Sequence, residues 1–226
     1  MALKRDYPFT ESLTFYIIII TVIVWILQLI TYPLVDDVFS LEPKTMSFGH
    51  AYQFLTYIFL HATYAETSAG VTIYPMHIAM NMLVFAIFGF PLEQATGKKR
   101  FIALYLISGI GSAVFYMAIM EMFIGVSGAG LIGASGAVFG VIAAYAFKFP
   151  RTWVYMLGFF PMPAALTLVF LLIEETFFGF MGLEPGVANF GHVGGIITGL
   201  LLMTVWRLTE KREKNFGEAG FEYVWE

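Results

Sequence analysis

The sequence lacks cysteine and has few charged residues: only 12% of its 226 residues are Asp, Glu, Lys or Arg. The absence of cysteine excludes disulfide bridges, thiolate metal sites and a cysteine nucleophile. An average soluble domain contains about 25% charged residues. Because this chain has too few polar residues to cover a soluble globule, its composition excludes an ordinary soluble domain, a disordered chain and a nucleic-acid-binding protein.

Apolar residues are abundant instead. They make up 59% of the chain and include 24 Phe and 12 Met, and the mean hydropathy is +0.78. A membrane-spanning helix needs about 20 mostly apolar residues. Several stretches of that length contain no charged residue, so the sequence predicts an all-α polytopic membrane protein that forms a single membrane domain.

The number of spans depends on how the segment Thr45–Ala65 is interpreted, because polar residues interrupt its apolar ones. Cytoplasmic loops are rich in Lys and Arg. If Thr45–Ala65 does not span, eleven of the twelve basic residues fall on one side and only Lys44 lies opposite. We therefore predict six spans in the cell membrane, with both termini cytoplasmic. The approximate spans are 12–35, 75–92, 101–122, 134–147, 152–173 and 188–206, with an outer loop 36–74 and a cytoplasmic tail 207–226.

The outer loop 36–74 is long for so small a protein. Unpaired backbone amides cost several kcal/mol in lipid, so this loop cannot lie in the bilayer as open chain. We expect it to fold on itself or to pack against the helix bundle, with Thr45–Ala65 partly embedded. Long structured loops are often functional.

Four polar side chains stand out within the predicted spans: His77, Asn81, Ser135 and His192. Such groups are rare in spans and mark functional sites. Counted along each helix from its predicted cytoplasmic end, they lie roughly 18 to 24 Å deep. They therefore form one layer contributed by three helices, which predicts a convergent site.

Glycines accompany two of these polar residues at four-residue spacing. They are Gly136 and Gly140 after Ser135, and Gly191, Gly195 and Gly199 around His192. Small residues at this spacing let helices approach closely in lipid. A hydrogen bond between a serine and a histidine on different helices requires that closeness.

Acyl transfer is the chemistry that these groups suit. His192 would take the proton of the Ser135 hydroxyl and later protonate the leaving amine. The Asn81 amide, a His77 nitrogen and the backbone N–H of Ser135 would stabilise the oxyanion. No acidic third member is visible, because every Asp is at position 6, 36 or 37, so we infer a Ser–His dyad.

Hydrolysis by a zinc site or by a pair of aspartates does not fit the sequence. It contains no H-E-x-x-H zinc motif and no pair of intramembrane aspartates. We expect neither a metal nor a cofactor.

The polar residues also belong to short motifs with a set order along the chain. The motifs are F-L-H at Phe59–His61, H-x-x-x-N at His77–Asn81, E-x-x-x-G at Glu93–Gly97, G-x-S-G at Gly133–Gly136, and a histidine with glycines at Gly191–Gly195 and Gly199. Together they resemble the rhomboid intramembrane serine proteases, over about His50 to Arg207.

This resemblance implies a six-helix rhomboid-like bundle and a role for each matched residue. Ser135 would be the nucleophile and His192 the general base, while His77, Asn81 and the Ser135 amide would form the oxyanion hole. Further implied roles are stacking of Phe139 on the histidine, space for the substrate at Gly133, and close packing at Gly136 and Gly195.

The resemblance also implies partners and moving parts. The substrate would be another transmembrane protein, locally unwound at its scissile bond, and membrane lipids would surround the site. The fifth span and the loop Glu174–Val187 resemble the family's mobile gate and cap. The sequence leaves the oligomeric state open.

Two features depart from the family pattern. Tyr52–Gln53 stands where many members have Trp-Arg, and the chain from His61 to His77 is longer than usual, with Ala62–Met76 inserted. Loop packing and substrate preference are the properties that these changes affect.

Two other functions remain open from the sequence. A rhomboid-like protein without activity would bind or escort membrane proteins, although the presence of both Ser135 and His192 speaks against it. A small channel or transporter would use His77 and Asn81, but the sequence shows neither an inverted repeat nor a pair of discontinuous helices.

Overall fold

Long helices form most of the protein. The computed structural model describes residues 7–43, 48–67, 70–123, 130–156, 159–182 and 188–221. Within these ranges, five helices are long and apolar enough to cross a membrane, which confirms the predicted all-α polytopic membrane fold. They are α1 (Leu13–Thr31), α4 (Met76–Thr96), α5 (Lys98–Phe123), α7 (Ala164–Met181) and α8 (Asn189–Phe221), and the shorter apolar helix α6 is Ser135–Lys148.

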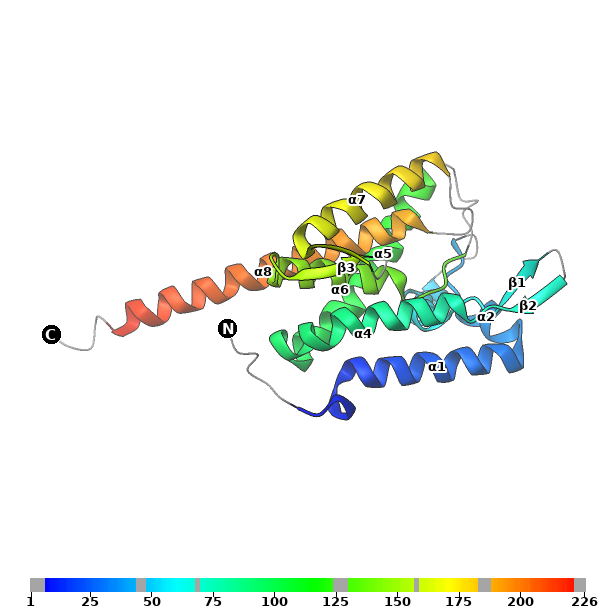
Figure 1. Ribbon diagram of the computed structural model, residues 1–226, viewed down its shortest axis with the longest axis horizontal. Helices are drawn as coiled ribbons and strands as arrows, with labels where there is room; N and C mark the ends of the chain where they lie inside the picture. The colour runs from blue at the N-terminus through cyan, green and yellow to red at the C-terminus, as the bar shows by residue number, and fades with distance from the viewer. Residues whose placement is uncertain are drawn as a thin grey trace.

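Helix α6 lies at the centre of the bundle. It contacts α4, α5, α7 and α8, while α1 packs on the far side of α4 (Figure 1). The start of α1 and the end of α8 lie at one end of the molecule, and the hairpin of β1 (Tyr64–Thr67) and β2 (Gly70–Ile73) lies at the other. This arrangement suits an even number of membrane crossings.

Helix α6 begins inside the bundle rather than at its surface. Its 14 residues extend only about 21 Å, less than the roughly 30 Å of the hydrocarbon core. The chain just before it therefore needs backbone partners from within the protein. Leu131 pairs with Leu41 in both directions, at 2.8 and 3.0 Å, and the Gly133 N–H donates to the Tyr57 carbonyl at 3.0 Å.

The loop 36–74, predicted to lie on the outer side, provides those partners and is itself folded, as the sequence predicts. Its elements are α2 (Leu34–Phe39), a 3-10 turn at Phe48–His50, α3 (Gln53–Thr56), a 3-10 turn at Tyr57–Phe59, β1 and β2. Gln53 is 2% exposed; it donates to the Val38 carbonyl at 3.1 Å and accepts from the Glu42 N–H at 3.4 Å. Gln53 thus ties together two parts of this loop.

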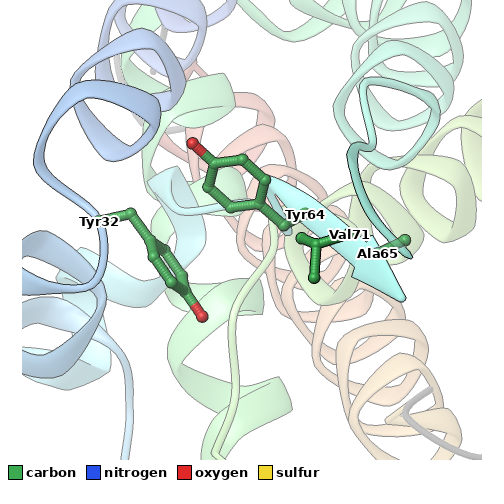
Figure 2. A pocket seen from close by; sticks show the side chains of 4 residues that line it. All are labelled: Tyr32, Tyr64, Ala65 and Val71. Atoms are coloured by element: carbon green, nitrogen blue, oxygen red, sulfur yellow. The ribbon is translucent and has the colours of Figure 1, made fainter. Parts of the chain in front are cut away.

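The antiparallel hairpin β1–β2 occupies the inserted part of this loop. It rests against the end of α1, where the Tyr64 hydroxyl donates to the Leu29 carbonyl at 3.1 Å. A surface hollow lies at this junction, lined by Tyr32, Tyr64, Ala65 and Val71 (Figure 2). None of these lining residues belongs to the predicted site.

The predicted fifth span begins later than expected. Residues assigned to its first half form an antiparallel hairpin, β3 (Trp153–Met156) and β4 (Phe160–Pro163), and helix α7 starts only at Ala164. Pro161 and Pro163 explain the difference, because proline disrupts a helix interior. A run of apolar residues indicates that a segment is buried in lipid or in protein, but it does not show that the segment is helical.

The same helix ends later than expected. Glu174 and Glu175 lie within α7, although the predicted cap loop started at Glu174. The end of that predicted loop, residues 183–187, lies outside the described residues.

The end of the bundle where α1 begins is held by a buried carboxylate. Glu93 is fully buried at the end of α4 and accepts hydrogen bonds of 2.8 to 2.9 Å from the Tyr7 hydroxyl and from the N-terminal residues Leu13 and Thr14 of α1. A carboxylate suits the free N–H groups and positive dipole at the start of a helix.

Candidate active site

The site lies along a seam between α6 and α8 that glycines make possible. A Cβ atom on Gly195 would overlap the carbonyl of Gly136, and one on Gly199 would overlap the carbonyl of Gly140. Because the atoms in the way are backbone, no side-chain rotation could relieve either clash. The two helices therefore touch main chain to main chain, the closest approach that helices can make.

This seam brings Ser135 and His192 together. Ser135 is the first residue of α6, and its Oγ lies 2.8 Å from Nε2 of His192. The ring of Phe139, one turn along α6, stacks on the His192 ring with centroids 4.4 Å apart and planes 13° apart. The histidine is 9% exposed, so its ring is held by neighbours on several sides.

His77 lies on the other side of the serine, at the start of α4. Its Nδ1 accepts the N–H of Ala62 at 3.1 Å, so in the neutral ring Nε2 carries the hydrogen. A Cβ placed on Gly133 would lie 3.4 Å from this Nε2 and 3.8 Å from the Ser135 Oγ. The donor edge of His77 therefore lies beside the serine across the empty space at Gly133.

Gly133 itself is required by the backbone. Its φ is +125°, a region that residues with a Cβ rarely adopt. This conformation turns the chain into α6 and sets the direction of the first free N–H groups of that helix, including that of Ser135.

Asn81 lies one turn beyond His77 on the same face of α4. Its Nδ2 donates to the His77 carbonyl at 2.9 Å, so its side chain bonds back to its own helix. The structure thus places Asn81 next to His77 but records no hydrogen bond from it to Ser135 or His192.

His61, which the sequence motif included without a role, supports the start of α6. Its Nε2 accepts the N–H of Ala134 at 3.4 Å, while Gln28 on α1 accepts its N–H at 3.0 Å and donates to its carbonyl at 3.1 Å. Burial, together with the nearby His77, lowers the pKa of His61 from 6.5 to about 3. The ring is therefore neutral at physiological pH and can accept from the residue before Ser135.

Glu175 is the residue that sequence reasoning missed. Its Oε2 lies 2.8 Å from Nδ1 of His192 and accepts the Nδ2–H of Asn189 at 2.9 Å. The sequence interpretation considered only aspartates and assigned Glu174 to a loop. The apolar residues that follow at 177–181 are the signal that the helix continues and that these carboxylates lie within it.

No cluster of three or more His, Cys, Asp or Glu side chains that could hold a metal ion occurs among the described residues. The chemistry that the site offers is that of a hydroxyl, two imidazoles, a carboxylate and free main-chain N–H groups.

Comparison with known proteins identifies relatives of this arrangement. Residues 48–208 match the model of the Rhomboid domain. The chain is 31% identical to RHOMBOID-like protein 6, mitochondrial, of Arabidopsis thaliana over 159 residues, which covers 70% of this chain and 45% of that protein.

Two microbial proteins are similarly related. Rhomboid protease AarA of Providencia stuartii is 32% identical, with 58% of this chain and 51% of that protein covered. Rhomboid protein 1, mitochondrial, of Saccharomyces cerevisiae is 31% identical, with 61% of this chain and 39% of that protein covered. The chain thus spans about half or less of the length of these relatives.

Proposed function

Since this chain belongs to the rhomboid family, we propose that it is an intramembrane serine endopeptidase that cleaves transmembrane helices with Ser135 and His192. The observation that carries the proposal is the 2.8 Å hydrogen bond between the Ser135 Oγ and the His192 Nε2. A relative named as a rhomboid protease supports it.

The Ser–His pair has the geometry for general-base catalysis. His192 would accept the Ser135 proton at Nε2 as Oγ attacks the scissile carbonyl, and would then return that proton to the leaving amine. The Phe139 ring, stacked on the imidazole, would keep the histidine aligned in both steps. Water would release the acyl group by the same route in reverse.

The oxyanion would form between α4 and the start of α6. His77 would donate from Nε2, because its Nδ1 is already an acceptor, and the Ser135 N–H would donate from the first turn of α6. Asn81 bonds to the His77 carbonyl, so it would donate to the oxyanion only with its second amide hydrogen or after its side chain rotates.

The substrate follows from the position of this site in a multi-pass membrane protein. The site lies at the end of the bundle that we propose to be the outer side, with both termini cytoplasmic. Because α6 starts inside the bundle, the scissile bond would have to come from a transmembrane segment that unwinds locally and enters from the bilayer.

The test is cleavage by purified protein in liposomes with a panel of single-span transmembrane substrates. Wild type is expected to cleave at least one of them, and Ser135→Ala and His192→Ala to cleave none. Thr204→Ala is the matched control, because it removes an exposed hydroxyl on α8 that bonds only to its own helix. Equal cleavage by wild type and Ser135→Ala would contradict the proposal.

Labelling with a fluorophosphonate separates the proposal from the alternatives without a known substrate. The reagent is expected to label wild type and Thr204→Ala at one serine and to leave Ser135→Ala unlabelled. Absence of both labelling and cleavage would favour a non-catalytic escort protein, and ion flux that survives Ser135→Ala and His192→Ala would favour a channel.

A further inference from the structure

A carboxylate lies behind the histidine of the proposed Ser–His pair. The Glu175 Oε2 is 2.8 Å from the His192 Nδ1, while the Ser135 Oγ is 2.8 Å from the opposite ring nitrogen, Nε2. The three side chains therefore lie next to one another, contributed by α6, α8 and α7, with Ser135 and Glu175 at opposite nitrogens of the His192 ring. We propose that Glu175 is a positioning residue that turns the Ser–His pair into a Ser–His–Glu triad. This role rests on the proposed protease function.

The first argument is the tautomer of His192. A neutral imidazole carries one N–H, and only the other nitrogen can accept a proton. His192 can act as a base toward Ser135 only when the hydrogen is on Nδ1. A carboxylate 2.8 Å from Nδ1 favours the hydrogen on that nitrogen through its negative charge, and so favours this tautomer. Without Glu175, no charge at Nδ1 would favour one tautomer over the other.

The second argument is charge in a dry environment. The side chains of His192 and Glu175 are only 11% and 10% exposed. When Ser135 attacks, its O–H bond breaks and an N–H bond forms at Nε2, leaving a positive imidazolium. The Nδ1 proton stays on the ring, so Glu175 remains a carboxylate and faces that new charge. Their attraction is strong at low dielectric and arises only after the proton has moved, which is the condition for lowering a barrier.

The third argument is that Glu175 is itself held in place. Asn189, which is 4% exposed, donates to the same Oε2 at 2.9 Å. Asn189 and His192 are three residues apart and thus on one face of α8. A buried carboxylate needs such a donor, and Asn189 holds this one beside His192.

The approach of α7 to α8 at this level depends on a glycine. Gly179 lies one turn after Glu175, and a Cβ there would come within 3.1 to 3.3 Å of the Phe190 ring and of the Asn189 Cβ. The same contact that brings the two helices together thus brings Glu175 to His192. The third member of the triad is therefore placed by the packing of α7 against α8, and not by α6 or α8 alone.

The test is the rate of fluorophosphonate labelling of Ser135 in the full-length protein in liposomes, together with kcat and KM for any substrate that wild type cleaves. Glu175→Gln keeps the shape but presents an N–H to Nδ1, which favours the wrong tautomer. Loss of the acid in such triads lowers kcat by up to about 10⁴-fold. We expect a fall of about 10²- to 10⁴-fold in labelling rate and in kcat. KM is expected to stay within twofold of the wild-type value, and the thermal unfolding midpoint within about 1 °C of it.

Two variants on the same helix serve as comparisons. Glu175→Asp retains the carboxylate on a shorter arm and is expected to recover activity to within about tenfold of wild type. Glu174→Gln removes the same charge one residue away, about 100° around the helix, and is expected to label within twofold of wild type. A fall common to both Gln variants would instead indicate a general effect of charge on α7.

A measurement on wild type avoids dependence on the folding of variants. In protein labelled with ¹⁵N-histidine, the His192 signals, assigned by their loss in His192→Ala, are expected to show Nδ1 protonated and Nε2 free. The opposite tautomer would overturn the proposal, as would a Glu175→Gln protein that labels at the wild-type rate while Ser135→Ala does not label. If wild type itself neither labels nor cleaves, the protease function fails first and the role of Glu175 with it.

Discussion

The α6–α8 seam and the α7–α8 interface meet at the same histidine but are built differently. Along the seam, glycines of α8 lie directly against carbonyls of α6. At the other interface, side chains fill the space, with Glu175 against His192 and Asn189. Half of the most apolar stretch of α8 is buried in the protein, against 17% for α7. His192 therefore lies between α6, which meets α8 main chain to main chain, and α7, most of whose apolar stretch is not buried in the protein. Figure 1 shows α7 at the edge of the bundle.

This difference separates two requirements of the proposed chemistry. The distance from Ser135 to His192 is set at the α6–α8 seam, where neither helix can move without breaking contacts between main-chain atoms. The position of Glu175 is set by a helix with few buried residues, so its contact with His192 can change at lower cost. Variants on each side of His192 should therefore differ in whether stability or activity suffers more.

The largest effect is expected from widening the seam. Gly195→Val would place a branched side chain against the Gly136 carbonyl, and overpacking of this kind costs about 3 kcal/mol or more when backbone must move. We expect a large loss of stability together with loss of labelling at Ser135, measured by unfolding of the detergent-solubilised protein with SDS and by fluorophosphonate. Wild-type stability in Gly195→Val would contradict the close packing of the seam.

Protonation of His61 is expected to destabilise the packing around the start of α6, next to Ser135, without affecting α7. The folded pKa is about 3 and the ordinary value is 6.5, so between these values the unfolded chain binds the proton more readily. The stabilisation is complete above about pH 6.5 and is lost as the pH falls toward 3, at up to about 1.4 kcal/mol per pH unit. Wild type should thus lose about 2 kcal/mol more than His61→Gln between pH 6.5 and 5, and equal losses would contradict the effect.

Removing the ring stacked on His192 is expected to reduce activity more than stability. Aromatic pairs contribute about 0.5 to 1.5 kcal/mol beyond burial, so Phe139→Leu should lower the labelling rate by up to about tenfold. Phe139→Tyr should retain most of it, because a flat ring remains. Phe147→Leu, the same change two turns further along α6, is the control, and an equal fall there would show that ring stacking is not the cause.

Among these variants, Gly179→Ala at the α7–α8 interface is expected to have the smallest effect. In Gly179→Ala the added methyl must displace Phe190 or Asn189 by a few tenths of an ångström, at about 1 kcal/mol of stability or less. Labelling should nevertheless fall severalfold, because α7 carries Glu175 away from His192. In the double variant with Glu175→Gln this fall should disappear, since the two changes act through one contact. Additive effects would show that Gly179 acts elsewhere.

Sequence reasoning found most of the residues that the proposed chemistry uses. The polar residues Ser135, His192 and His77 stand out because lipid tolerates few polar groups. The glycines stand out because closely packed helices need small residues. Their spacing along single helices was enough to predict one layer and one seam. The proline pair at 161 and 163 also indicated where α7 starts, although the apolar run around it suggested a longer helix.

Glu175 shows what the sequence did not reveal. No spacing relates it to His192, because the two residues are on different helices whose approach is set by Gly179, Phe190 and Asn189. Similarly, the sequence contained His61 within a motif but not its bond to the Ala134 N–H, which depends on how the outer loop folds back onto the start of α6.

Composition and the order of motifs along the chain thus determined that this protein lies in a membrane, belongs to one family and carries a serine and a histidine at one depth. Those properties follow from the solvent and from local helix geometry, which the sequence contains directly. The tertiary structure alone decided which ring nitrogen of His192 faces Ser135, which edge of His77 lies beside that serine and which acid lies beside His192. Each of these depends on contacts between elements far apart in the chain, and such contacts exist only once the helices have packed.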